Sequence, residues 1–432
     1  MKILVVGSGG REHAIVWALA REKGVTVLCA PGNPGIAELA TCYPIDVTDL
    51  GGLVALANRE AVDLTVVGPE LPLSLGLADV MSEAGLKVFG PTKAAAALEW
   101  SKAFAKDFMR RHHVPTARFE TCQTPEHARA VLESGVLGFP IVLKADGLAA
   151  GKGVVIAADR STAVRAIDEM MVARRFGASG DTVVLEEFLA GEEASYFVLA
   201  AGEPFVPLSS AQDHKRIFDD DLGPNTGGMG AFSPSPLMTS EVEARVLDEI
   251  VRPVLRGMAA EGHPFYGFLY VGLMLTPAGP KVVEFNVRFG DPEAQVILPR
   301  LQESLSALLL SAVSGQFTAP AVHFSSEKYV CVVMASGGYP ERSGSGDVIT
   351  GLADAGGIED VLVFHAGTAR KDGAVVTHGG RVLTIVGHGP SYEAAIETAY
   401  RAADRIHFDG MQMRRDIGRK AVAAEAALQQ SR

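Results

Sequence analysis

Cysteine is scarce in this sequence, and the four that occur form no metal-binding or disulfide pattern. Cys29, Cys42, Cys122 and Cys331 lie far apart, and no CxxC pair is present. This spacing is typical of a reduced, cytoplasmic protein rather than of a disulfide framework or a zinc ribbon. We therefore expect a cytoplasmic protein whose core forms without cross-links, and 432 residues are enough to bury such a core.

Long apolar runs and an excess of positive charge are also absent. No stretch of about 18 apolar residues occurs, so no membrane span is expected, and the first residues are typical of a strand rather than of a signal peptide. Lys and Arg number 39 against 51 Asp and Glu, a formal charge of −12. Because nucleic-acid binding depends on dense Lys and Arg, we expect neither a nucleic-acid partner nor a membrane. A few local groups can still bind a small phosphorylated ligand.

Glycine, by contrast, is plentiful, with 47 residues. The pattern of apolar and polar residues changes near residue 102 and again near residue 325. These changes agree with about three domains, the number expected from a typical domain size of about 150 residues. The glycines concentrate in the turn after the first apolar run and in segments 147–153 and 223–230. We expect backbone to approach a ligand closely in these places, because glycine lacks a Cβ.

Three apolar runs in the first region, residues 2–6, 25–30 and 64–67, are typical of buried strands. Strands that alternate with helices predict right-handed crossovers and a parallel sheet, in which ligands bind at the loops after the strands. The loops that follow these runs supply five candidate substrate-binding residues, namely Gly9, Arg11, His13, Asn33 and Glu70.

The first loop, residues 7–13, does not complete a dinucleotide-binding pattern. A GxGxxG motif beginning at Gly7 needs a third glycine where Glu12 stands, and no ribose-binding acid follows at the expected strand end. A dehydrogenase is therefore disfavoured, and a turn that binds no ligand stays an alternative. The backbone N–H groups at the start of the helix can instead bind phosphate, with help from Arg11 and His13.

A hairpin with a tip of Gly and Ala is predicted over residues 140–156. The tip is not a P-loop, because Asp146 and Gly153 stand where GxxxxGK[ST] needs Gly and Ser or Thr, and because a P-loop joins a strand to a helix. A tip of small residues can still close over a triphosphate as a lid, with charge from Lys144 and Lys152. An ordinary mobile loop is the alternative.

The strongest local chemistry follows the predicted strand at residues 281–285. Side chains alternate along a strand, so Glu284, Asn286 and Arg288 share one face. Carboxylate and amide oxygens suit Mg²⁺, and an adjacent arginine can bind phosphoryl oxygens. The solvated face of an edge strand is the alternative, and the turn at residues 290–292 favours the functional interpretation.

Two other polar stretches allow a functional and a plain interpretation. Residues 212–230 cannot pack a core, so this long stretch is either functional or disordered. The acidic residues on both sides of segment 188–191 fit an acidic surface loop or a purine pocket with a ribose-binding carboxylate.

The remaining segments predict core elements. Ser240 and Glu243 form a capping-box pattern ahead of an apolar helical stripe at residues 247–258. Apolar runs at 329–335 and 382–386 predict further sheet, and residues 393–406 predict a helix.

Six long segments match one family in that family's own order. They are residues 7–14 (GSGGREHA), 144–154 (KADGLAAGKGV), 213–216 (DHKR), 223–230 (GPNTGGMG), 284–293 (EFNVRFGDPE) and 378–383 (HGGRVL). On these segments, which extend over nearly the whole chain, the sequence resembles the phosphoribosylamine–glycine ligases, or glycinamide ribonucleotide synthetases, of the ATP-grasp superfamily.

The resemblance implies an α/β protein of three domains. These are a Rossmann-like N-terminal domain over residues 1–103, an ATP-grasp domain over 104–324 with a flexible lid at about 121–193, and a small C-terminal α/β domain over 325–425. The length of 432 residues leaves no room for a further fused enzyme.

The resemblance also implies the reaction. Glycine would be joined to 5-phosphoribosylamine through glycyl phosphate, giving glycinamide ribonucleotide, ADP and phosphate in de novo purine synthesis. ATP would be the co-substrate and Mg²⁺ (or Mn²⁺) the metal, and the partners would be these small molecules alone. A monomer is expected.

Roles for individual residues follow from the same resemblance. Glu186 and the backbone of Phe188 and Leu189 would contact adenine, and Glu193 the ribose. The full set expected to bind ATP is Lys106, Lys144, Gly151, Gly153, Glu186, Phe188, Leu189 and Glu193. Glu284 and Asn286 would bind the metal, the substrates would contact Asn225, Gly290 and Asp291, and the catalytic residues would be Arg288, Lys144 and Asp213.

Two departures from the family pattern stand out. Many ATP-grasp enzymes carry a second metal-binding carboxylate on the preceding strand, but residues 268–275 contain no acid. Phe218 and Asp220 stand where family members often have glycine.

Three other functions stay as alternatives. They are another ATP-grasp carboxylate–amine ligase or carboxylase of purine synthesis, a dehydrogenase, and a non-catalytic nucleotide sensor. The intact Glu284, Asn286 and Arg288 disfavour the sensor.

Overall fold

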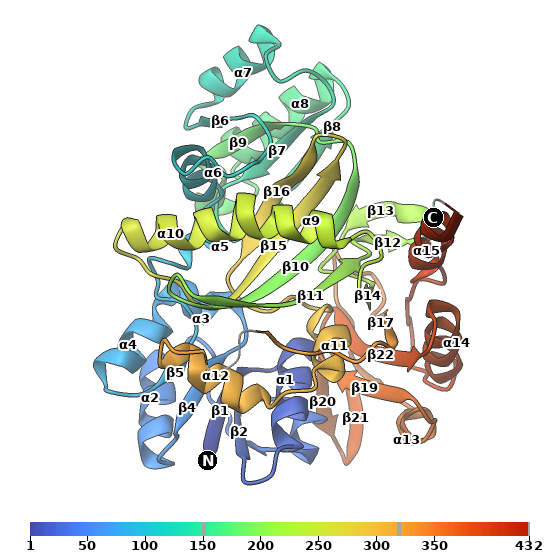
Figure 1. Ribbon diagram of the computed structural model, residues 1–432. Helices are drawn as coiled ribbons and strands as arrows, with labels where there is room; N and C mark the ends of the chain where they lie inside the picture. Colours follow the sequence, from blue (N-terminus) through green and yellow to red (C-terminus); the bar gives the residue numbers. More distant parts are fainter. Residues whose placement is uncertain (149–152, 318–320, 431–432) are drawn as a thin grey trace.

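The computed structural model describes residues 1–148, 153–317 and 321–430. Within these residues, no helix is long and apolar enough to cross a membrane. The chain forms a blue N-terminal part and an orange-red C-terminal part side by side, with the green and yellow central part across them (Figure 1). The helices are α1 (Gly10–Ala20), α2 (Leu50–Arg59), α3 (Glu70–Leu75), α4 (Leu77–Glu83), α5 (Ala97–Trp100), α6 (Lys102–Arg111), α7 (Pro125–Ser134), α8 (Arg160–Ile167), α9 (Ser240–Arg245), α10 (Arg252–Ala260), α11 (Ala294–Ile297), α12 (Leu305–Val313), α13 (Leu352–Gly356), α14 (Tyr392–Ala403) and α15 (Arg419–Gln430).

The N-terminal part is built on a parallel sheet, as the sequence predicts. Its strand order is β3-β2-β1-β4-β5. The strands are β1 (Lys2–Gly7), β2 (Thr26–Pro31), β3 (Thr41–Cys42), β4 (Leu64–Val67) and β5 (Val88–Phe89). Because β1 lies between β2 and β4, the loops after these three strands meet at one edge of the sheet. Cys29 and Cys42 are register partners on β2 and β3, and all four cysteines are free thiols.

The central sheet continues into the C-terminal part, which sequence patterns did not indicate. Its eight strands run in the order β16-β15-β10-β11-β14-β17-β22-β19. They are β10 (Glu192–Ala201), β11 (Phe205–Asp213), β14 (Gly230–Ser233), β15 (Tyr266–Thr276), β16 (Gly279–Asn286), β17 (Lys328–Ala335), β19 (Val361–His365) and β22 (Arg381–Gly389). The pairing of β14 with β17 joins the two parts into one continuous sheet.

A four-stranded sheet and two helices form a separate lobe at the top of Figure 1. The strands are β6 (Phe119–Cys122), β7 (Ile141–Ala145), β8 (Val154–Ala157) and β9 (Val183–Glu187), in the order β6-β9-β7-β8. The predicted hairpin is confirmed, because β7 pairs antiparallel with β8. Helices α7 and α8 pack with the sheet around a core of its own.

Two small sheets complete the architecture. β12 (Arg216–Phe218) pairs with β13 (Leu222–Asn225), and β21 (Ala374–His378) lies between β18 (Ser345–Val348) and β20 (Thr368–Lys371). The long polar stretch at residues 212–230 is therefore ordered, as a hairpin on the β11–β14 connection.

The predicted apolar stripe lies on a helical run from α9 to α10, and its residues Ile250, Val254 and Met258 are fully buried. The predicted capping box is wrong by one residue. Thr239 is the N-cap and accepts a hydrogen bond from Val242 N, whereas Ser240 is the first helical residue. Glu243 instead accepts a hydrogen bond from the hydroxyl group of Tyr196, so a tertiary contact decides its role.

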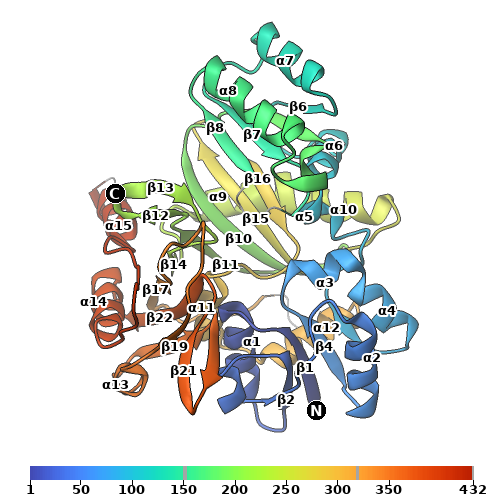
Figure 2. The same cartoon turned by 180° about the vertical axis from the view of Figure 1, so that it is seen from behind.

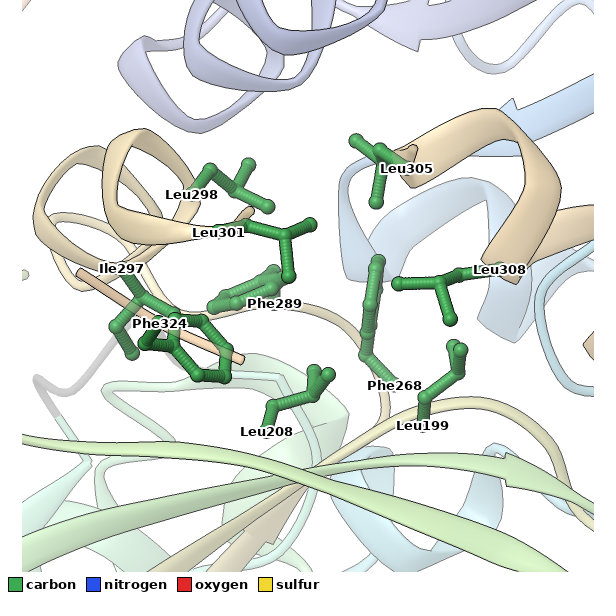
Figure 3. Close-up of a pocket in the computed structure, with 10 residues that line it drawn as sticks. All are labelled: Leu199, Leu208, Phe268, Phe289, Ile297, Leu298, Leu301, Leu305, Leu308 and Phe324. Carbon is green, nitrogen blue, oxygen red and sulfur yellow. The ribbon is translucent and has the colours of Figure 1, made fainter. Parts of the chain in front are cut away.

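A small apolar cavity lies between the central sheet and the helices α11 and α12 (Figure 3). Ten side chains line it, namely Leu199, Leu208, Phe268, Phe289, Ile297, Leu298, Leu301, Leu305, Leu308 and Phe324. Phe289 stacks on Phe197 with ring centroids 4.9 Å apart and meets Phe268 edge-on at 4.6 Å. These aromatic contacts fix the chain directly after Arg288.

Buried histidines join the N-terminal part to the C-terminal part, where α1 lies beside β19 (Figure 2). The backbone N–H of His365 donates to Nδ1 of His13 at 2.8 Å, and Asn33 Nδ2 donates to the carbonyl oxygens of Ser8 and His365 at 2.8 and 2.9 Å. Burial lowers the pKa of His13 to about 3 and that of His365 to about 4. Both rings are therefore neutral at physiological pH.

Acid is expected to destabilise the protein through these histidines. A histidine that is neutral when folded but ionises near pH 6.5 when unfolded contributes stability that is lost as pH falls below 6.5, by up to about 1.4 kcal/mol per pH unit for each ring. Urea unfolding at pH 7, 6 and 5 should show a shallower pH dependence for His13→Gln than for the wild type. The exposed His127→Gln serves as the control, and parallel curves for His13→Gln and wild type would contradict the prediction.

Candidate functional site

The three loops after β1, β2 and β4 meet, as the sequence predicts, and Glu12 lies among them. Its carboxylate accepts the Gly9 N–H at 2.6 Å and Arg11 Nε. A Cβ on Gly7 or Gly68 would come within 2.5 Å of the Glu12 side chain. Glu12, which stands where the GxGxxG pattern needs its third glycine, thus places a carboxylate between the loops. Its negative charge would repel a pyrophosphate at this place.

Asn33 and His13, two of the predicted substrate-binding residues, hold the loops in place. Both the nitrogen and the oxygen of the Asn33 side-chain amide form hydrogen bonds within the protein. Its Nδ2 donates to two carbonyl oxygens, and its Oδ1 accepts a hydrogen bond from the backbone N–H of Ile36. His13 is buried against His365 and Phe364. Gly9, in the turn after β1, lies near Asp291. A Cβ added to Gly9 would lie 3.7 Å from Asp291 Oδ2.

Arg288 is the centre of a buried charge network that joins the N-terminal part to β16. Its Nη2 lies 2.8 Å from Glu99 Oε1 and donates to Asn286 Oδ1 at 3.0 Å, and its Nε lies 3.2 Å from Glu70 Oε2. Glu70 also lies 3.8 Å from Arg11 Nη1. Residues that the sequence places in four separate segments therefore form one cluster.

The charges in this network shift one another's pKa values. Burial tends to raise the pKa of Glu70, but Arg288 and Arg11 outweigh it and lower the pKa to about 2. Burial raises the pKa of Glu99 to about 7 in spite of Arg288. Burial opposes the charge of Arg288, yet Glu99 and Glu70 raise its pKa above the usual value. Arg288 is thus a permanent cation, whereas Glu99 can take up a proton near neutral pH.

Lys106 and Lys144 converge on one buried carboxylate. Glu186 Oε2 lies 2.8 Å from Lys106 Nζ, and its Oε1 lies 2.9 Å from Lys144 Nζ. Burial lowers the pKa of Lys106 to about 8, while Glu186 opposes that shift. Burial raises the pKa of Glu186, but Lys144 and Lys106 outweigh it and the net pKa is lowered. Two ammonium groups therefore face one another across a single counter-ion.

Replacing Glu186 with Gln is expected to destabilise the ligand-free protein and to enlarge its stabilisation by ATP. Breaking a buried ion pair by removing one partner costs about 3–5 kcal/mol, and a polyphosphate can restore the missing negative charge. Thermal unfolding with and without ATP measures both effects, with the exposed Glu120→Gln as the control. An ATP-induced shift equal to that of the wild type would contradict the prediction.

Glu284 and Asn286 present oxygen atoms on one face of β16, as the alternation of side chains predicts. Phe285 and Val287 between and after them are buried, at 2% and 1% exposure, whereas the Glu284 side chain is 40% exposed. Within the described ranges, no group of three or more His, Cys, Asp or Glu side chains could hold a metal. The two oxygen donors fit Mg²⁺ only if phosphate and water complete its coordination, which is the usual way that Mg²⁺ binds.

An acidic cluster surrounds Lys215 next to this face. Lys215 Nζ lies 2.8 Å from Glu193 Oε2 and 4.0 Å from Glu284 Oε1. Burial raises the pKa of Asp213, with further contributions from Glu193 and Glu284 that Lys215 opposes. Burial, followed by the charge of Asp213, raises the pKa of Glu293 to about 7. The cluster combines an ammonium group with carboxylates of different proton affinity.

Of the predicted lid residues, Gly153, Phe188 and Leu189 fall within the described part of the chain. Gly153 accepts a backbone hydrogen bond from Ala145 at the base of the β7–β8 hairpin, and Gly151 falls outside the described residues. Phe188 and Leu189 follow β9 directly, and the Phe188 side chain is exposed.

The hairpin with Phe218 and Asp220 is anchored to the C-terminal segment. Asp220 has a φ of +58°, which Asp tolerates better than most residues, and its N–H donates to Asp416 Oδ2 at 3.0 Å. The buried Arg414 lies 2.8 Å from Asp221 Oδ1. The departure from glycine in this loop is thus accommodated by contacts with the C-terminal segment.

The remaining substrate-pocket candidates are Asn225, Gly290 and Asp291. Asn225 ends β13 and pairs in register with Arg216. A Cβ on Gly290 would lie 2.4 Å from Glu293 Oε2, so a larger residue there would displace the Glu293 carboxylate. Both carboxylate oxygens of Asp291 are held by the protein, one by Gln295 and one by Arg381.

Sequence reasoning missed several polar residues of the site. Glu99 and Lys102 lie at the junction of α5 and α6, where Lys102 donates to the Gly147 carbonyl at 2.8 Å. Lys215 and Arg381 were noted only as parts of longer motifs. A Glu on a short helix carries no local signal, because only the fold brings Glu99 to the backbone N–H of Val287 at 2.7 Å.

Comparison with protein families matches nearly the whole chain. The N domain of phosphoribosylglycinamide synthetase matches residues 1–99, its ATP-grasp (A) domain matches 100–294, and its C domain matches 329–420.

Named relatives and solved structures agree with these family matches. The chain is 49% identical over 429 residues to a phosphoribosylamine–glycine ligase of Vibrio vulnificus (98% of this chain, 99% of the relative) and 50% identical over 429 residues to one of Pseudomonas aeruginosa, with the same coverage. The crystal structure of phosphoribosylamine–glycine ligase from Thermotoga maritima superposes with a TM-score of 0.85 at 37% identity, over 96% of this chain and 100% of that one. A biotin carboxylase from Campylobacter jejuni shares the fold alone, with a TM-score of 0.73 at 14% identity over 95% and 92% of the two chains.

Proposed function

This chain belongs to the phosphoribosylglycinamide synthetase family, and from that premise we propose how its residues carry out the family's reaction. The enzyme joins glycine to 5-phosphoribosylamine with ATP, giving glycinamide ribonucleotide, ADP and phosphate. A carboxylate is a poor acyl donor, so the glycine carboxylate first attacks the γ-phosphorus of ATP and ADP leaves. The ribosylamine nitrogen then attacks the carbonyl of glycyl phosphate, phosphate leaves, and the nitrogen loses a proton.

Lys106 and Lys144 bind the ATP phosphates in this proposal. Their ammonium groups both contact Glu186, and all three side chains are buried. Such fixed positive charge stabilises phosphoryl transfer mainly by positioning and by electrostatics. Gly151 and Gly153 let the hairpin close over the phosphates, Glu186 with the backbone of Phe188 and Leu189 contacts adenine, and Glu193 contacts the ribose.

Glu284 and Asn286 would hold Mg²⁺ or Mn²⁺ through their side-chain oxygens. The ion, when bound, neutralises phosphate charge as the phosphoryl group moves. Arg288 reaches the transferring group from the same face, and its planar fork suits phosphoryl oxygens.

Asp213, Asn225, Gly290 and Asp291 form the pocket for the amino acid and the ribosylamine. Asp213 and Asp291 are anionic partners for the substrate amino groups, and Gly9, Arg11 and Glu70 face the ribosylamine from the N-terminal loops. His13 and Asn33 support these loops from behind.

One observation carries this assignment, namely the shared face of β16 on which Glu284 and Asn286 meet Arg288. The decisive assay measures ADP release with ATP and metal while glycine and phosphoribosylamine are omitted in turn. We expect release only when both are present, because the acyl phosphate is consumed by the amine. ADP release that depends on bicarbonate instead of glycine would identify a carboxylase, and binding of NADH would identify a dehydrogenase.

The wider assignments rest on the same premise. We assign residues 1–103, 104–324 and 325–425 to the three domains, with the lid at about 121–193. We also propose that the enzyme works as a monomer in the cytoplasm on small molecules alone, which is supported by its free thiols and its acidic charge.

A further inference from the structure

Arg381, at the start of β22 in the C-terminal part, reaches into the site and bridges two loops. Its Nη1 donates to the carbonyl oxygens of Gly227 at 2.6 Å and of Asp291 at 2.7 Å, and its Nη2 donates to Asp291 Oδ2 at 2.9 Å. The guanidinium therefore uses its planar fork on one carboxylate and two backbone segments, which no other side chain type can imitate.

The partners of Arg381 are fixed from the other side as well. Asp291 Oδ1 accepts from Gln295 Nε2 at 2.7 Å, so neither carboxylate oxygen is free to rotate. The Gly227 N–H donates to the hydroxyl of Tyr339, also from the C-terminal part, at 3.0 Å. A Cβ on Gly227 would lie 3.0 Å from Arg381 Cζ, so glycine lets the guanidinium lie directly against the backbone.

Asp291 is held in this way next to the N-terminal turn. An added Cβ on Gly9 would lie 3.7 Å from Asp291 Oδ2, the oxygen that Arg381 binds. Burial tends to raise the pKa of Asp291, but Arg381 and Arg11 outweigh it and keep the group ionised. The carboxylate is therefore an anion of fixed orientation at the meeting point of all three parts of the chain.

We propose that Arg381 is a positioning residue through which the C-terminal part fixes Asp291 and the 223–230 loop in the geometry that binds 5-phosphoribosylamine. The inference rests on the proposed function, because it takes Asp291 as part of the substrate pocket. The hydrogen bonds of Arg381 go to Gly227, Gly228 and Asp291 rather than to Lys106, Lys144 or Glu186, so we expect ATP binding not to depend on it. In this proposal the C-terminal part contributes to the ribosylamine pocket through Arg381.

Steady-state kinetics of Arg381→Gln tests the inference, with phosphoribosylamine generated in the assay from ribose 5-phosphate and ammonia. We expect the KM for phosphoribosylamine to rise about tenfold or more, as for the loss of a charge-assisted hydrogen bond, while the dissociation constant of ATP, measured by calorimetry, stays within about twofold of the wild-type value. Arg381→Lys should recover only part of the loss, because a point ammonium cannot bridge both loops. Gly227→Ala should reproduce the same KM defect with Arg381 intact.

The exposed Arg401→Gln on α14 is the control and should behave as wild type. An unchanged KM in Arg381→Gln, full recovery in Arg381→Lys, or a parallel loss of ATP affinity and thermal stability would each overturn the inference. Failure of the proposed function looks different, because the wild-type enzyme itself would then release no ADP with glycine and phosphoribosylamine.

Discussion

Replacing Glu284 with alanine should abolish metal-dependent ligation. Glu284 offers the only carboxylate on the β16 face, since Phe285 and Val287 point into the core and Asn286 contributes a neutral oxygen that Arg288 already contacts. The preceding strand cannot compensate, because residues 268–275 carry no acid. Loss of several kcal/mol of charge stabilisation by the ion corresponds to a fall in kcat of at least about a hundredfold.

The measurement is the rate of ADP release as a function of Mg²⁺ concentration, with both substrates saturating. The Glu284→Ala enzyme should stay folded and should not recover at high Mg²⁺, because the remaining amide is a weak ligand by itself. Glu203→Ala, an exposed glutamate on the β10–β11 turn, is the matched control and should keep wild-type rates. Unchanged turnover in Glu284→Ala would remove the metal assignment.

Replacing Arg288 with lysine should lower kcat by about tenfold to a hundredfold, with a much smaller change in the KM for ATP. The fork of Arg288 spans Glu99, Glu70 and Asn286, and a lysine ammonium cannot maintain three such contacts and also reach a phosphoryl group. Removing one well-placed electrostatic contact of the transition state costs about 2.7–4 kcal/mol where it has been measured, and the retained charge of lysine recovers part of it.

Lysine is chosen because it keeps the positive charge between the carboxylates of Glu99 and Glu70, so the fold is expected to tolerate it better than alanine. Single-turnover measurements of ADP formation separate the phosphoryl step from binding. Arg256→Lys on α10, an exposed position, is the control. Wild-type kcat at saturating ATP in Arg288→Lys would contradict a role for the guanidinium in phosphoryl transfer.

Periodic patterns predicted much of the architecture. The apolar runs correspond to β1, β2 and β4, and the resulting parallel sheet brings their loops together. The alternation along β16 correctly placed Glu284 and Asn286 on one face and Phe285 on the other. Each of these predictions uses neighbouring residues only, because a strand's periodicity is a local property of its backbone.

Predictions that needed distant contacts were less complete. The Glu12 side chain fills the space between Gly7 and Gly68. Gly68 lies 56 residues after Glu12 in the chain, so the incomplete motif around Glu12 does not reveal this contact. Glu186 was assigned to adenine from resemblance, and the structure adds its ion pairs with Lys106 and Lys144. The capping box failed because Glu243 bonds to Tyr196 on another element.

The sequence by itself determined the family, the three-part order and the residue types of the site, because long motifs and backbone periodicity are written in contiguous residues. Only the tertiary structure decided which charges meet. Glu99 contacts Arg288, which lies 189 residues further along the chain, and Arg381 reaches Asp291 from β22 in the C-terminal part. Buried charges must find partners wherever the fold supplies them, and that choice depends on packing rather than on position along the chain.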